Sequence, residues 1–136
     1  MLALSIKQPW AYAIIHLGKD VENRNWKTNV RGQILIHAPK SFDVEGYNYI
    51  KYDMGLDLPE IKDIQRGGIV GAAKIIDCVT QSDSEWFFGP YGFVLKDAIE
   101  LPFTQMNGAL GFFTVIGGER AFNVPNKKLT NQLLIQ

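Results

Sequence analysis

Three charged side chains stand close together in the segment GKDVENRNW at residues 18–26, namely Lys19, Glu22 and Arg24. In an extended segment Glu22 and Arg24 point to the same face because they are two residues apart, and Lys19 at the preceding turn can lean over that face. A guanidinium and an ammonium beside one carboxylate can bind a phosphate or the polar edge of a base. The spacing therefore predicts a cradle for an anion or a nucleobase.

The same trio also has a purely structural interpretation. Glu22 and Arg24 can form a salt bridge that ties the first helix to a sheet, and for an isolated set of charges this is the commoner outcome. Residue types and spacing alone leave both interpretations open.

The segment SIKQPW at residues 5–10 places Lys7 and Gln8 directly before Pro9. Proline fits the first position of a helix, so Lys7 and Gln8 lie where this helix begins. There they add a cation and an amide near the positive end of the helix. We therefore expect both residues to contribute to the same ligand site.

Aromatic residues offer further candidates for ligand contact. Trp10 lies on the apolar stripe of the first helix and is predicted to pack in the core. Trp26 stands among polar residues and can be either a platform for base stacking or a lid on the fold. The loop EWFFGPYG at residues 85–92 can be a flap over the site or an aromatic plug, and Tyr91 is its candidate binding residue.

The formal net charge of the 136-residue chain is zero, but the charges are unevenly distributed. Residues 1–40 carry an excess of four positive charges, residues 41–66 an excess of three negative charges, and the remainder an excess of one negative charge. Proteins that track a long nucleic-acid backbone usually carry a basic surplus. The pattern therefore favours a grip on a short segment or on one nucleotide.

Other classes of site have little support in the composition. Cys78 is the single cysteine and is expected to be buried, so an internal disulfide or a thiolate metal cluster is excluded. Two histidines without an accompanying acidic or thiolate cluster do not suggest a metal, and we predict neither metal nor cofactor. The sequence contains no apolar run of about 20 residues and no signal-peptide pattern. The expected location is the cytoplasm, without a membrane partner.

Hydrophobic periodicity predicts an α+β fold built around a small mixed β-barrel, with two or three short flanking helices. Helices are expected from Trp10 to Leu17, ended by Gly18, and over residues 43–55. Strands are expected at residues 2–6, 33–38, 69–79, 91–101 and 110–116. We expect a single domain over residues 1–136, with residues 118–136 as a C-terminal extension.

Four segments together are similar to one family: LSIKQPWAYAIIHLGKDVENR, RGQILIHAPK, GGIVGAAKIIDCV and GPYGFVL. They resemble the ASCH domain, the activating-signal-cointegrator homology domain, which is related to the PUA domains of RNA-modifying proteins. The resemblance runs from about Leu2 to Phe113 and implies a PUA-like β-barrel. It also implies a cleft between barrel and first helix, lined by Lys19, Glu22 and Arg24, and so favours a ligand site over a simple salt bridge.

The resemblance implies two classes of function. The first is a module that binds nucleic acid, RNA above all, or a nucleotide; no protein partner is indicated. The second is a small hydrolase acting on RNA or modified nucleosides, with Lys19 and Glu22 as an acid–base pair. Family members that are amidohydrolases carry a nucleophilic threonine three residues after the lysine, where this chain has Glu22. Ser5 and Thr28 lie near the motif, but neither has a histidine at motif spacing, so binding is the preferred function.

Overall fold

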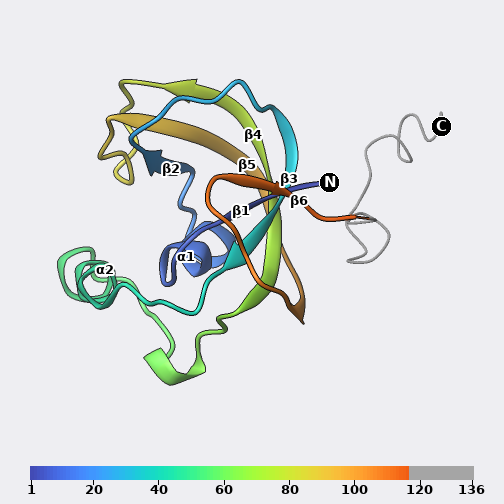
Figure 1. Ribbon diagram of the computed structural model, residues 1–136. Coiled ribbons are helices and arrows are strands. Elements are labelled where there is room, and N and C mark those ends of the chain that lie inside the picture. Colours follow the sequence, from blue (N-terminus) through green and yellow to red (C-terminus); the bar gives the residue numbers. More distant parts are fainter. Residues whose placement is uncertain (117–136) are drawn as a thin grey trace.

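The computed structural model of the chain describes residues 1–116 (Figure 1). The predicted C-terminal extension, residues 118–136, lies outside the described residues. The described elements are β1 (Leu2–Ser5), α1 (Trp10–His16), β2 (Val21–Arg24), β3 (Gly32–Ala38), α2 (Val44–Asn48), the π-helical turn η1 (Tyr49–Asp53), the 3-10 turn η2 (Ile61–Asp63), β4 (Gly68–Val79), β5 (Tyr91–Gln105) and β6 (Phe112–Thr114).

The strands form one mixed sheet in the order β2-β5-β4-β3-β1-β6. The β1–β3 pair is parallel and the other pairs are antiparallel. Figure 1 shows β4 and β5 curving around α1, which lies on the concave side of the sheet. The predicted α+β class with a small PUA-like barrel is confirmed, although the sheet does not close, because the edge strands β2 and β6 do not pair with each other.

The parallel β1–β3 pair brings together segments that are far apart in the sequence. Its register places Leu4 opposite Ile36 and Ser5 opposite His37. Parallel strands need a crossover connection, and here that connection contains α1 and β2. The crossover therefore contains the whole Lys19–Arg24 segment, which leaves α1 and enters the sheet as its edge strand β2.

The core confirms the alternation predicted for β3. Ile34, Ile36 and Ala38 are buried in one cluster with residues of β1, α1 and β5, whereas Leu35 is buried in a second cluster on the opposite face. A third cluster contains Ala13, Val21, Ile50 and Trp86, and it joins α1, β2, η1 and the 85–92 loop. The elements around the charged motif are thus fixed to one another by apolar packing.

Two helix predictions differ from the structure in detail. Pro9 is the N-cap of α1 rather than its first helical residue, while Gly18 ends the helix with a positive φ of 77°, as predicted. The second predicted helix is divided: α2 ends at Asn48 and continues as η1, in which the Met54 N–H donates to the Tyr49 carbonyl. This wider turn accompanies complete burial of Ile50, which periodicity alone does not reveal.

No helix among residues 1–116 combines the length and the apolar character that crossing a membrane requires. Within the same residues, no three His, Cys, Asp or Glu side chains gather in a way that could hold a metal ion. Cys78 was expected to be buried, but it is partly exposed near the end of β4.

Candidate functional site

The three charged residues of the motif are held by local backbone structure. Lys19 stands in the turn between α1 and β2, where its N–H donates to the Ala13 carbonyl at 3.0 Å. Glu22 and Arg24 lie on β2, which pairs with β5. This edge strand is extended, so the two side chains share a face as the sequence predicts.

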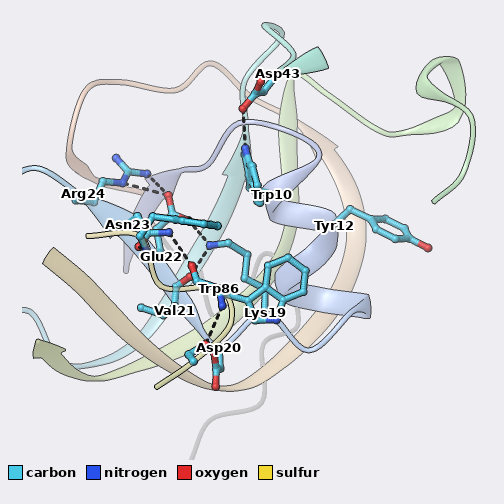
Figure 2. A network of polar contacts seen from close by, with 12 residues as sticks. Trp10, Tyr12, Lys19, Asp20, Val21, Glu22, Asn23, Arg24, Asp43 and Trp86 are labelled. Carbon is cyan, nitrogen blue, oxygen red and sulfur yellow. Dashed lines mark hydrogen bonds and ion pairs between the residues drawn. The ribbon is translucent and has the colours of Figure 1, made fainter. Parts of the chain in front are cut away.

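Lys19, Glu22 and Arg24 form one connected ion network, drawn in Figure 2. Lys19 Nζ lies 2.9 Å from Glu22 Oε1 and also donates to the Val21 carbonyl. Arg24 donates to Glu22 Oε2 through Nε at 3.2 Å, and its Nη2 lies 3.1 Å from the same oxygen. Arg24 Nη2 also donates to the Ser5 carbonyl at 2.7 Å, which ties β2 to β1.

Burial makes this network part of the fold as well as a candidate site. Lys19 is only 3% exposed and Glu22 only 8% exposed. A charge at such depth needs a partner, because desolvation of an unpaired ion costs several kcal/mol. The ligand-site interpretation and the salt-bridge interpretation therefore describe the same three residues rather than excluding each other.

A cavity of about 200 Å³ opens beside the network and is called the cleft below. Its lining consists of Trp10, Lys19, Glu22, Asn23 and Phe88. Lys19 Nζ lies 5.7 Å from the centroid of the Trp10 ring, a distance typical of a cation–π contact. The cleft thus combines two aromatic side chains with a cation, a carboxylate and an amide.

Trp10 is fixed in place at one side of the cleft. Its Nε1 donates to Asp43 Oδ2 at 2.8 Å (Figure 2). Asp43 Oδ1 accepts the Gly46 N–H and so caps α2. A Cβ atom added to Gly46 would stand 2.6 Å from Trp10 Cζ2, so only glycine fits beneath the ring. Trp10 also packs against the core as predicted, but its partly exposed position lets it line the cleft.

Asn23 positions the aromatic loop on the other side of the cleft. Its Nδ2 donates to the Trp86 carbonyl at 2.9 Å, and its Oδ1 accepts the N–H groups of Phe88 and Gly89 at 2.8 and 3.0 Å. Trp86 is buried in the core, whereas Phe88 is 57% exposed. The loop is therefore both a plug, through Trp86, and a wall of the cleft, through Phe88.

Asn23 and Phe88 were not among the candidates drawn from the sequence. The hydrogen bonds that give Asn23 its role reach residues more than 60 positions away, so no local pattern identifies them. Phe88 belongs to the aromatic loop that the sequence singled out, but Tyr91 was the residue selected from that loop.

The remaining candidates lie elsewhere. Lys7 is exposed and does not line the cleft. Gln8 is 3% exposed, and its side chain forms hydrogen bonds within the fold. Its Nε2 donates to the Gln65 carbonyl, and its Oε1 accepts the Tyr12 N–H. Gln8 lines a separate cavity of about 230 Å³.

Trp26 and Tyr91 are not brought to the cleft either. The ring centroid of Trp26 lies 5.2 Å from that of Phe93 and 5.8 Å from that of Phe112, both in edge-to-face geometry. These contacts are typical of a lid over the core. Tyr91 is half-buried on β5, in register with Arg24.

Comparison with known proteins agrees with the family expected from the sequence. The ASCH domain matches residues 4–119 of the chain. Human "Activating signal cointegrator 1" is 29% identical over 114 residues, which cover 72% of this chain and 19% of that protein. The mouse protein of the same name is 33% identical over 86 residues, which cover 57% of this chain and 14% of that protein.

The chain spans less than a fifth of the length of these curated relatives, so it corresponds to one part of them. The family match, in contrast, extends over most of the chain and includes α1 and the whole Lys19–Arg24 motif. This chain belongs to the ASCH domain family.

Proposed function

We propose that the cleft binds one unpaired nucleobase, either within a short segment of RNA or in a free nucleotide. The observation that carries this proposal is the lining of the cleft, in which Trp10 and Phe88 stand beside Lys19, Glu22 and Asn23. Aromatic side chains stack on the faces of bases, and polar side chains read their edges. The family relationship to PUA domains supports RNA as the ligand class.

The polar groups retain capacity for a ligand despite their internal contacts. An ammonium has three donors, and Lys19 uses two of them on the Val21 carbonyl and on Glu22. A carboxylate has about four acceptor sites, and the contacts of Glu22 are with Lys19 and Arg24. Lys19 can therefore donate to a base carbonyl or ring nitrogen, and Glu22 can accept from an exocyclic amino group.

The size and charge of the cleft favour contact with a short stretch of nucleic acid. Two cations surround one carboxylate, so the motif has a single excess positive charge. A cavity of about 200 Å³ is small for a ligand pocket, whose usual range begins near 300 Å³. We therefore propose recognition of one base and not of an extended nucleic-acid track.

A hydrolase that uses Lys19 and Glu22 as acid and base is the second proposal from the sequence. No feature of the cleft favours it, since among residues 1–116 no serine, threonine or cysteine side chain lines this cavity. Both oxygens of the Glu22 carboxylate are also engaged by cations. Binding requires only the groups that are present.

A ligand panel tests the binding proposal. Nucleosides, nucleotides and short single-stranded RNAs should be screened by thermal shift, because a ligand at a hundredfold its dissociation constant stabilises the fold by about 2.7 kcal/mol. Phe88→Ala should weaken binding by about 1–3 kcal/mol, the usual loss for one base–aromatic stack. Phe103→Ala, another exposed aromatic residue, is the matched control and should bind normally.

Two results would overturn the proposal. One is a panel in which no nucleobase compound raises the melting temperature. The other is binding that Phe88→Ala and Phe103→Ala affect equally. RNA cleavage that survives purification and is lost in both Lys19→Ala and Glu22→Gln would make the hydrolase the primary function.

We further propose that residues 1–136 act as one ASCH domain, with residues 118–136 as its extension. The proposed location is the cytoplasm. Cell fractionation with antibody detection tests this location.

A further inference from the structure

Ser5 and His37 form a hydrogen-bonded pair at a second cavity, apart from the nucleobase cleft. Ser5 Oγ lies 2.9 Å from His37 Nδ1, and His37 Nε2 lies 2.6 Å from the Met106 carbonyl oxygen. Both side chains line a cavity of about 740 Å³. We infer that Ser5 and His37 are a nucleophile and its general base, and that they hydrolyse carboxylic esters with short apolar acyl groups.

The hydrogen bonds determine which nitrogen of His37 carries the proton. A carbonyl oxygen can only accept, so the 2.6 Å contact requires a hydrogen on Nε2. In the neutral ring Nδ1 then has a lone pair, and it accepts the hydroxyl hydrogen of Ser5. This is the chain of roles found in hydrolases with a serine nucleophile: hydroxyl, imidazole base, and a group that orients the base.

The surrounding backbone holds this pair rigidly. His37 is 2% exposed and lies on β3, and its ring packs edge-on against Phe113 at 5.8 Å. Ser5 lies opposite it on β1, and Arg24 fixes the Ser5 backbone through its carbonyl oxygen. A nucleophile and base on neighbouring strands keep their separation because the sheet fixes both backbones.

The loop of residues 107–110 lies against the pair through Gly108. A Cβ atom added to Gly108 would stand 2.5 Å from both Ser5 Oγ and His37 Cε1, so only a glycine allows this approach. Among residues 1–116, no acceptor is bonded to the backbone N–H groups of residues 107–110. N–H groups beside a nucleophile are the usual donors to a tetrahedral oxyanion, and we assign this role to the N–H groups of the loop, whose Gly108 packs against Ser5.

The walls of the cavity indicate the substrate class. Pro39, Met106, Ala109 and Leu110 provide an apolar lining, and Leu110 is 99% exposed at its rim. Lys40 is the cation in the lining. A volume of about 740 Å³ lies within the usual range for small-molecule pockets, so an ester with a short apolar acyl group fits both size and polarity.

The proposed ester hydrolysis needs water as its only other reactant. Ser5 Oγ bonds to the ester carbonyl carbon while its proton passes to His37 Nδ1. The bond from this carbon to the alcohol oxygen then breaks, and the alcohol leaves with that proton. Water attacks the acyl group on Ser5 and gives a proton to Nδ1, which returns it to Ser5 Oγ as the acid is released.

Covalent labelling of the unaltered chain is the decisive experiment. The protein should be incubated with a fluorophosphonate probe, and the adduct should be located by peptide mass spectrometry. We expect one adduct, on Ser5. Because this measurement needs no variant, it tests the nucleophile even where a substitution disturbs folding.

Ester hydrolysis supplies the second measurement, with p-nitrophenyl butyrate as the probe substrate. Ser5→Ala and His37→Gln should each lower kcat/KM by at least ~100-fold, the usual contribution of a positioned general base. Glutamine at position 37 can still donate to the Met106 carbonyl but has no basic nitrogen. Thr80→Ala, which removes an exposed hydroxyl, is the control and should change kcat/KM by less than about twofold.

Either of two results would overturn the inference. The first is a wild-type protein without an adduct on Ser5. The second is release of p-nitrophenol by Ser5→Ala at the wild-type rate, with the variant shown to be folded by its melting curve.

Discussion

The cleft beside Trp10 and the Ser5–His37 cavity differ in how the chain assembles them. The charged network beside the cleft, Lys19, Glu22 and Arg24, lies within six positions of the sequence, although Arg24 itself does not line the cavity. One turn and one edge strand bring these residues together. The Ser5–His37 pair is separated by 32 positions and depends on the parallel β1–β3 register. The charged cluster can therefore be predicted from the sequence, whereas the Ser5–His37 pair forms only when the sheet has formed.

The two regions also differ in charge. Lys19, Glu22 and Arg24 are ionised groups in a poorly solvated place, whereas the bonds among Ser5, His37 and the Met106 carbonyl need no ionised group. Removal of one member of a buried ion network leaves a desolvated charge, while removal of one neutral partner leaves only an unsatisfied hydrogen bond. We therefore expect a larger loss of folding stability when alanine replaces a residue of the ion network than when it replaces a residue of the neutral pair.

The largest effect is expected from Glu22→Ala. It leaves Lys19, whose side chain is 1% exposed, without a counter-ion, and loss of a partner from a buried pair typically costs about 3–5 kcal/mol. Urea unfolding should show this decrease in the free energy of unfolding. Glu85→Ala, on an exposed residue, is the control. A decrease of less than about 1 kcal/mol in the free energy of unfolding would mean that water in the cleft solvates Lys19. The expected difference in stability effect between Glu22→Ala and Ser5→Ala would then be absent.

Gly46→Ala tests whether the cleft depends on packing as well as charge. The new Cβ would stand 2.6 Å from Trp10 Cζ2 and 2.7 Å from Asp43 Oδ2, and overpacking of this kind costs about 1–3 kcal/mol. Because the Trp10 ring must move, nucleotide affinity should fall along with the melting temperature. Glu45→Ala, an exposed change in the same helix, should alter neither. A variant with normal stability and normal affinity would contradict the fixed position of Trp10.

Ser5→Ala should destabilise the fold less than Glu22→Ala. The substitution removes one neutral hydrogen bond from His37, with a typical cost of about 1 kcal/mol. Thermal unfolding beside Ser82→Ala, an exposed serine, measures the difference. A loss as large as that of Glu22→Ala would show that the neutral pair is as important to folding as the ion network.

The smallest effect on stability is expected from Lys7→Ala, within about 0.5 kcal/mol, because the side chain is exposed. The Lys7→Ala variant is useful as a test of ligand binding. If Lys7 contacts a phosphate next to the bound base, its removal should reduce the slope of log affinity against log salt by about 0.7, the value for one contact on a single strand. Titrations of a short RNA at several salt concentrations measure this slope. An unchanged slope would remove Lys7 from the ligand site.

Much of the architecture follows from local patterns. Alternation in β3 correctly assigned Ile34 and Ile36 to one face and Leu35 to the other, because side chains alternate across any strand. Gly18 correctly marked the end of α1, because glycine adopts a positive φ easily, whereas Pro9 precedes the first helical residue by one position. The divided helix after Asn48 was not predictable, because burial of Ile50 depends on packing against α1 and the 85–92 loop.

The cleft shows the same division between what local sequence predicts and what tertiary packing decides. The sequence by itself determined that Lys19, Glu22 and Arg24 would meet, because a turn and an extended strand place them on one face. Only the tertiary structure decided that Trp10 and Phe88 would flank them, that Trp26 would pack on Phe93, and that Ser5 would find His37. The physical reason is that side-chain direction is a local property of the backbone, whereas a contact between distant segments depends on strand register and core packing, which the whole chain decides together.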